Sequence, residues 1–205
     1  MKEDNLDNAL RADRAQLLER DDSCLVIIDV QSVFLNKLPL DWRGPLVERI
    51  AWLMRVARVL CIPIVATAED MARNGPLVPE LTELLPADSP SVFNKRVFGL
   101  YGQQDTREAI EASGRGTFIL VGCETDICVA QSAIGIRGAG YRVCVVENAC
   151  GSPPPNHEVG IQRMRDAGII VTSLKGVYFE WVRDLKTHHR VMAELKVPLP
   201  AGITL

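Results

Sequence analysis

Short apolar runs rich in Val, Ile and Leu alternate along this chain with longer segments of helical spacing. The runs predict strands over 24–30, 62–68, 91–95, 117–123, 141–148 and 168–174. Continuous apolar runs are typical of parallel strands that are covered on both faces. Strands that alternate with helices form right-handed βαβ units. We therefore expect a three-layer α/β/α fold around a six-stranded parallel, Rossmann-like sheet.

The segments between the strands predict the covering helices. Apolar residues spaced by three and four predict helices over 45–60, 78–85, 104–113, 126–138, 156–167 and 176–194. Residues 1–22 predict a charged leading helix, and residues 185–205 form a C-terminal extension. With 205 residues and no linker-like composition, the chain is expected to form one domain over 1–205.

Composition narrows the function classes. The net charge is −3, and no basic stripe predicts binding to nucleic acid. The N-terminus is too charged for a signal peptide, and no apolar run approaches the roughly 20 residues of a membrane span, so we expect a cytoplasmic protein. The six cysteines include no CxxC pair, and no HExxH occurs. Neither a disulfide scaffold nor a zinc site is expected.

Three chemically active side chains follow predicted strands. Asp29 ends the first strand, Lys95 follows the third, and Cys128 lies five residues past the fourth, near the start of a helix. Ligands of open parallel sheets bind beyond the carboxyl ends of the strands. The three positions therefore predict a site at that edge of the sheet.

The three residue types suit acyl transfer. A thiolate attacks a carbonyl carbon, and a helix N-terminus and a nearby ammonium are expected to lower the pKa of the Cys128 thiol. Asp29 can take the thiol proton and return it to the leaving group. Each residue alone has a plainer interpretation, since Asp often caps a turn, Lys is usually solvated and Cys often packs in a core.

Three segments together resemble a known superfamily. CLVIIDVQSVF (24–34), VFNKRVFG (92–99) and ILVGCETDICVAQSA (119–133) are similar to the signatures of the isochorismatase-like cysteine hydrolases. NGPLVPEL (74–81) and GVYFEWVRDL (176–185) further resemble a bacterial subgroup of poorly defined substrate. The similarity runs from about residue 23 to 182.

The resemblance implies a catalytic triad of Asp29, Lys95 and Cys128. It implies strand order 3-2-1-4-5-6, a cis peptide bond between Cys123 and Glu124, and an oxyanion hole made of the backbone N–H groups of Glu124 and Cys128. Four further residues are expected to shape the substrate pocket: Gln31, Phe34, Phe98 and Thr125. For Gln31, a structural hydrogen bond is the equal alternative.

Two departures from relatives in the superfamily narrow the activity. Nicotinamidases carry a histidine metal motif after the second strand, whereas ATAEDMARNG (66–75) has no histidine, so no catalytic metal and no cofactor are expected. Isochorismatases that cleave a vinyl ether lack the cysteine, which disfavours that reaction here. The expected function is hydrolysis of a C–N bond in a small amide or carbamoyl compound through a thioester.

Other functions stay open at this point. The chain could be a binding or scaffold protein that keeps the fold, or a hydrolase of an isochorismate-like vinyl ether. A thiol-redox role is disfavoured without CxxC, and a nucleotide-binding Rossmann domain without G-x-G-x-x-G. The resemblance also implies a homo-oligomer with a small-molecule substrate.

Overall fold

The six strands of the described residues form one parallel sheet. The computed structural model describes residues 16–86 and 92–205. The sheet order is β3-β2-β1-β4-β5-β6, and every pairing is parallel, as expected. The strands are β1 (Ser23–Ile28), β2 (Ile64–Glu69), β3 (Phe93–Lys95), β4 (Thr117–Cys123), β5 (Arg142–Gly151) and β6 (Ile170–Thr172).

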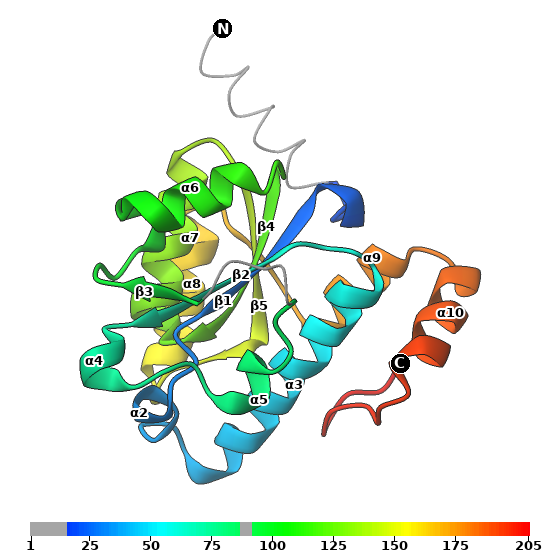
Figure 1. The fold of residues 1–205 in the computed structure, drawn as a ribbon, viewed down its shortest axis with the longest axis horizontal. Helices are drawn as coiled ribbons and strands as arrows, with labels where there is room; N and C mark the ends of the chain where they lie inside the picture. The colour runs from blue at the N-terminus through cyan, green and yellow to red at the C-terminus, as the bar shows by residue number, and fades with distance from the viewer. Residues whose placement is uncertain (1–15, 87–91) are drawn as a thin grey trace, which may run out of the picture.

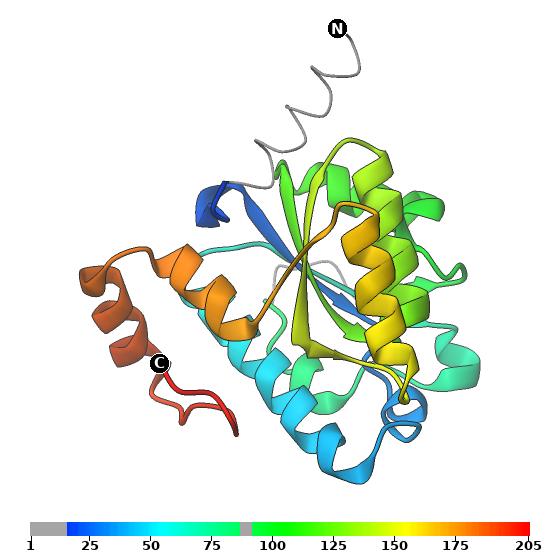
Figure 2. The same ribbon diagram turned by 180° about the vertical axis from the view of Figure 1, so that it is seen from behind.

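Helices cover both faces of the sheet, which gives the three layers (Figures 1 and 2). One face carries α3 (Leu40–Val59) and α9 (Leu174–Val182), and the other carries α6 (Gln104–Ala112), α7 (Ala130–Gly138) and α8 (Asn156–Asp166). Short helices stand in the loops: α2 (Ser32–Leu35), α4 (Met71–Asn74), α5 (Pro79–Thr82), and the 3₁₀ turns Arg20–Asp22 and Leu100–Gly102.

The alternation of side chains along β1 explains the two cores. Leu25 and Ile27 pack in the core beneath α3 and α9, whereas Val26 and Ile28 pack in the core beneath α6, α7 and α8. Successive side chains of a strand point to opposite faces, so a strand that is apolar throughout needs cover on both. All six residues of β1 are buried.

Two helix predictions are corrected. The single helix expected over 176–194 is two helices, α9 and α10 (Leu185–Leu195), because Arg183 adopts φ 62° and ends the first. Asp184 then caps the second by accepting a hydrogen bond from the Thr187 N–H. In the leading segment, residues 1–15 lie outside the described residues, and residues 16–19 are not helical.

The carboxyl end of the β1–β4 pair is unusually close-packed. Gly122 has φ 127°, and a Cβ there would lie 2.0 Å from the backbone oxygen of Ile28. Only glycine fits this position without a shift of backbone. The tight approach brings the end of β1 against the end of β4.

Among the described residues, no helix is long and apolar enough to cross a membrane.

Candidate active site

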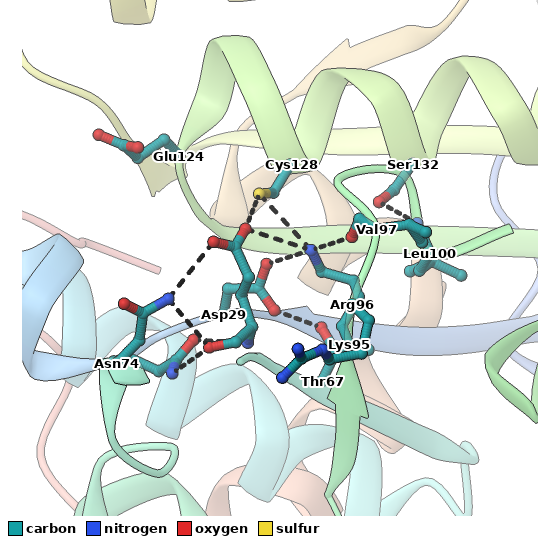
Figure 3. A network of polar contacts seen from close by, with 12 residues as sticks. Asp29, Thr67, Asn74, Lys95, Arg96, Val97, Leu100, Glu124, Cys128 and Ser132 are labelled. Carbon is teal, nitrogen blue, oxygen red and sulfur yellow. Dashed lines mark hydrogen bonds and ion pairs between the residues drawn. The ribbon is translucent and has the colours of Figure 1, made fainter. Parts of the chain in front are cut away.

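Four reactive side chains lie at the ends of four neighbouring strands. Lys95 and Glu69 are the last residues of β3 and β2. Asp29 directly follows β1, and Cys128 lies five residues past β4. The strand order reverses direction at the β1–β4 pair, where open α/β sheets bind their ligands. Figure 3 shows the side chains of Asp29, Lys95 and Cys128 pointing toward one another at this edge.

The ammonium of Lys95 lies at the centre of the cluster. Its Nζ is 2.9 Å from Asp29 Oδ2, 3.6 Å from Glu69 Oε2 and 3.6 Å from Cys128 Sγ. It also donates a hydrogen bond of 2.7 Å to the Val97 carbonyl. The Lys95 and Asp29 side chains are both fully buried. A fully buried ammonium requires such partners, because desolvation without them is costly.

Asp29 is held on both of its oxygens. Oδ1 accepts a hydrogen bond of 2.8 Å from the Thr67 hydroxyl, and Oδ2 faces Lys95. Asp29 itself adopts φ 49°, a left-handed conformation that is uncommon for a residue other than glycine. Such conformations gather at functional sites, where the surroundings enforce them.

The thiol of Cys128 has a carboxylate partner that the sequence reasoning missed. Sγ donates a hydrogen bond of 3.2 Å to Glu69 Oε2, and the Glu69 side chain is 19% exposed. Cys128 lies in a π-helical turn (Thr125–Val129) that leads directly into α7. Glu69 ends β2 as Asp29 follows β1, so the same strand-end rule would have found it.

Gln31 fixes the end of β2 from within the protein. Its Oε1 accepts from the Glu69 N–H at 2.7 Å, and its Nε2 donates to the carbonyls of Glu69 at 2.9 Å and Gly75 at 2.6 Å. Gln31 is fully buried. This geometry favours the structural hydrogen bond over a place at the pocket mouth.

The electrostatics of the cluster correct one expectation. The pKa of the Cys128 thiol is raised, because burial and the Asp29 charge outweigh the lowering by Lys95. Burial likewise raises the pKa of Asp29 against the opposing effect of Lys95. Burial alone would lower the pKa of Lys95, but Asp29, Cys128 and Glu69 raise it overall. The resting site therefore holds a charged ammonium beside a protonated thiol.

The other predicted site residues have mixed surroundings. Thr125 is buried with its hydroxyl 2.9 Å from His157 Nδ1, and Phe34 is buried beneath the Lys37 ammonium, 4.8 Å from the ring centroid. Phe98 is 55% exposed. The Cys123–Glu124 peptide bond is cis. The Glu124 carboxylate points away from the thiol and pairs with Lys37 at 3.1 Å.

The same cluster contains a possible metal-ligand set. One ligand atom from each of Asp29, Glu69 and Cys128 lies within 4.8 Å of the others. The Lys95 ammonium stands among them, however, and neutralises the carboxylates that a cation would need. These residues fit an internal ammonium better than a metal ion. The absence of a catalytic metal stays a prediction.

The comparisons with known proteins show the family of the chain. The model of the isochorismatase domain matches residues 23–176. The chain belongs to the isochorismatase family. The match includes all four strand-end residues and ends inside α9.

Two relatives show how far the likeness extends. The probable hydrolase YcaC of Escherichia coli is 27% identical over 180 residues, covering 87% of this chain and 86% of its own. Its crystal structure, described as an octameric hydrolase of unknown specificity, superposes with a TM-score of 0.79 over 87% of this chain and 88% of its own. YcaC of Pseudomonas aeruginosa superposes with a TM-score of 0.80 at 26% identity, over 88% and 90%. The family match and these relatives support hydrolase activity for this chain.

Proposed function

We propose that this isochorismatase-family hydrolase cleaves a C–N bond of a small amide or carbamoyl compound, with Cys128 as nucleophile. The observation that carries the proposal is the placement of the Cys128 thiol between a carboxylate at 3.2 Å and an ammonium at 3.6 Å, at the β1–β4 switch point. A binding module has no need of a reactive thiol in such surroundings.

The proposed reaction has two halves. A carboxylate beside the thiol accepts its proton as Sγ bonds to the carbonyl carbon, and the carbonyl π pair moves to oxygen. The backbone N–H groups of Glu124 and Cys128 are the proposed oxyanion donors. The proton then passes to the nitrogen as the C–N bond breaks. Water attacks the thioester, gives its proton to the carboxylate, and releases the acid and the thiol.

Lys95 and Asp29 complete the proposed triad. Lys95 stabilises the thiolate as it forms, because its ammonium lowers the cost of a negative charge on Sγ. Asp29 holds that ammonium in place, and it is the carboxylate that we propose takes the thiol proton and returns it to the leaving nitrogen. The proposal needs no cofactor, because all the proton transfers take place within this cluster.

One relative supports thiol chemistry. The Pseudomonas aeruginosa YcaC structure is described with covalent acrylamide, an electrophile that thiols attack. The octameric description of the Escherichia coli YcaC supports a homo-oligomer for this chain too. The substrate pocket in our proposal is open to small molecules only, since Cys128 is 3% exposed.

The first test combines modification and turnover. Wild type and Cys128→Ala are treated with iodoacetamide between pH 7 and pH 10, and the adducts are located by mass spectrometry of peptides. Both proteins are then offered a panel of primary amides, ureido acids and carbamoyl compounds, with ammonia release as the readout. Cys61→Ser is the matched control, because Cys61 is exposed and precedes the amino end of β2, whereas the cluster lies at the carboxyl ends of the strands.

The expected result is ammonia release that disappears in Cys128→Ala and persists in Cys61→Ser. Because the pKa of the Cys128 thiol is raised, labelling of Cys128 should increase with pH throughout this range. Hydrolysis that survives Cys128→Ala would contradict the nucleophile. Vinyl-ether cleavage of isochorismate without amide hydrolysis would favour the alternative hydrolase, and ligand binding without turnover would favour a scaffold.

A further inference from the structure

We propose that Glu69 determines the specificity of the site, by admitting neutral groups that present N–H donors beside the reacting carbon and excluding groups that carry a negative charge there. Where it concerns hydrolysis, the inference rests on the proposed function, because it narrows the class of substrate. The selectivity itself can be measured at the Cys128 thiol without a substrate.

Glu69 lies beside the reacting sulfur, on the accessible side of the cluster. Its Oε2 accepts the hydrogen bond of 3.2 Å from the Cys128 thiol. The side chains of Asp29 and Lys95 are fully buried, whereas that of Glu69 is 19% exposed. Of the three charged groups in the cluster, Glu69 is therefore the one that a molecule approaching the thiol meets.

The charge of Glu69 is only partly balanced. Lys95 Nζ is 2.9 Å from Asp29 Oδ2 but 3.6 Å from Glu69 Oε2, so one ammonium serves two carboxylates and lies nearer to Asp29. The next carboxylate along the chain, Asp70, has a cation of its own, since it lies 2.6 Å from Arg96. An anion placed against Glu69 is repelled, and a partly buried site screens that repulsion less than water does.

Two amide side chains hold Glu69 in position. Gln31 Oε1 accepts from the Glu69 N–H at 2.7 Å, and Gln31 Nε2 donates to the Glu69 carbonyl at 2.9 Å. Asn74 Nδ2 donates to the same carbonyl at 3.2 Å and lies 3.4 Å from Oε1. A carboxylate whose supports are fixed in this way keeps its place when an unsuitable group approaches, which is what discrimination between ligands requires.

The Glu69 carboxylate selects for N–H donors as well as against anions. It offers acceptors only, and each of its oxygens can accept more than one hydrogen bond. The nitrogen of a primary amide or ureido group donates N–H bonds, whereas a carboxylate in the same place donates none. In the proposed complex the carbonyl oxygen faces the N–H groups of Glu124 and Cys128, and the nitrogen is the substituent that Glu69 binds.

A narrower class of substrate follows from this arrangement. The site suits a neutral primary amide or ureido compound that has no carboxylate next to the reacting carbonyl group. An isochorismate-like vinyl ether, which carries carboxylates, suits it poorly.

The test compares three alkylating reagents of similar shape at Cys128. Iodoacetamide presents a neutral amide with N–H donors, iodoacetate presents a negative charge, and 2-iodo-N,N-dimethylacetamide is neutral without N–H donors. Rates are measured by mass spectrometry of peptides between pH 8 and pH 10, and each is divided by the rate of free N-acetylcysteinamide in the same solution. All three reagents react with the same thiolate, so its ionisation cancels from the ratio of any two normalised rates.

The expected results separate charge from hydrogen bonding. In wild type, the normalised rate of iodoacetamide should exceed that of iodoacetate by about 10–100-fold, because like charges repel strongly in a partly buried site. Glu69→Gln keeps the shape of the side chain and removes its charge, so this ratio should fall by about the same factor. Its preference for iodoacetamide over the dimethyl reagent should also shrink, by about two- to tenfold, because an amide oxygen accepts more weakly than a carboxylate.

Asp70→Asn is the matched control, because Asp70 is the next residue and its carboxylate pairs with Arg96. Loss of this paired charge should leave the wild-type ratios unchanged within about twofold. Glu69→Asp keeps the charge on a shorter side chain, so it should lie between wild type and Glu69→Gln, and it serves if Glu69→Gln fails to fold. A wild-type iodoacetamide-to-iodoacetate ratio near one, an unchanged ratio in the Glu69 variants, or an equal fall in Asp70→Asn would overturn the proposal.

Hydrolysis separates this inference from the proposed function. The amides 3-oxobutanamide and malonamate are similar in size, but only malonamate is charged. Wild type should hydrolyse the neutral amide with the higher kcat/KM, and Glu69→Gln should narrow the difference, mainly through KM.

The two proposals fail in different ways. No ammonia release by wild type, or release that persists in Cys128→Ala, would remove the proposed function, while the labelling ratios would still decide the role of Glu69. Hydrolysis that depends on Cys128, with labelling ratios unchanged in Glu69→Gln, would remove only the role of Glu69. A Cys128 thiol that none of the reagents labels at pH 10 would overturn both.

Discussion

Each end of the β1–β4 strand pair carries an aspartate, and the two aspartates have opposite surroundings. At the amino end, Asp22 accepts hydrogen bonds of 2.8 Å from the Gly116 N–H and 2.8 Å from the Thr117 hydroxyl, in an exposed setting. At the carboxyl end, Asp29 is fully buried and faces the ammonium of Lys95. The first aspartate joins two strands with neutral donors, and the second depends on a buried charge.

The difference follows from what each end has to do. Neutral donors near water give a modest, local gain and leave no charge without compensation. A buried carboxylate–ammonium pair is costly to desolvate. Removal of only one partner costs more, because it leaves the other charge buried and unpaired. The carboxyl end carries this desolvation cost, and it holds carboxylate, ammonium and thiol groups close enough together for the proposed proton transfers. The amino end connects two strands, whereas the carboxyl end is the proposed reaction site.

The largest effect should come from breaking the buried pair. Lys95→Met would leave the Asp29 carboxylate without its ammonium, and we expect the free energy of unfolding at pH 8 to fall by about 3–5 kcal/mol. The folded-state pKa of Asp29 is already raised, so its ionisation opposes folding once the pH exceeds the unfolded value. Loss of Lys95 widens that gap. The destabilisation should therefore be smaller at pH 5 than at pH 8, which urea unfolding at both pH values measures.

The double variant Asp29→Asn/Lys95→Met is the control for Lys95→Met. Because it removes both charges, it should recover part of the lost stability. A cost below about 1 kcal/mol in Lys95→Met, with no dependence on pH, would mean that the carboxyl end is no more sensitive than an exposed ion pair.

A smaller effect should come from Gln31, whose side chain holds the carboxyl end of β2 at the proposed site. Gln31→Ala removes three hydrogen bonds to the Glu69 and Gly75 backbone, and the Glu69 carbonyl keeps a hydrogen bond of 3.2 Å from Asn74 Nδ2. We expect a loss of about 2–3 kcal/mol in the free energy of unfolding. It should also slow hydrolysis, since Glu69 loses its fixed backbone. Urea unfolding and the kcat of any identified amide provide the two measurements.

Gln103→Ala is matched to Gln31→Ala. The Gln103 side chain accepts from the Arg96 N–H and donates to the Asn94 carbonyl and the Asp105 carboxylate, near the end of β3, but all three bonds are exposed. Water can replace the lost amide there, so the cost should stay below about 1 kcal/mol. Equal losses of unfolding free energy in the two variants would show that the burial of Gln31 does not make its hydrogen bonds more important than those of an exposed glutamine.

The sequence predicted the sheet because its strands are apolar on both faces. The parallel pairing and the positions of Asp29, Lys95 and Cys128 at strand ends could be stated from the residues, and the strand order from the family resemblance. The break at Arg183 could not, because φ 62° at an arginine leaves no mark in the composition. The spacing of apolar residues simply continued across it.

The chemistry of the site was harder to predict than its position. A nearby ammonium does lower the pKa of a thiol, but the balance depends on burial and on two carboxylates whose distances the sequence does not contain. Glu69 was not among the predicted site residues, because a single glutamate after a predicted strand is usually exposed to solvent. Only the pairing of β2 with β1 and β3 brings it beside Asp29 and Lys95.

The smallest effect should come from the amino end. Asp22→Ala would remove the two hydrogen bonds to Gly116 and Thr117, and water could take the place of the carboxylate. We expect about 0.5–1.5 kcal/mol less stability in urea unfolding, with no change in the pH profile of Cys128 labelling. Thr117→Val removes one of the two donors and should cost less than Asp22→Ala. If Asp22→Ala changed Cys128 labelling, the two ends of the β1–β4 pair would be coupled through the strands, and the separation between the connecting end and the proposed reaction site would fail.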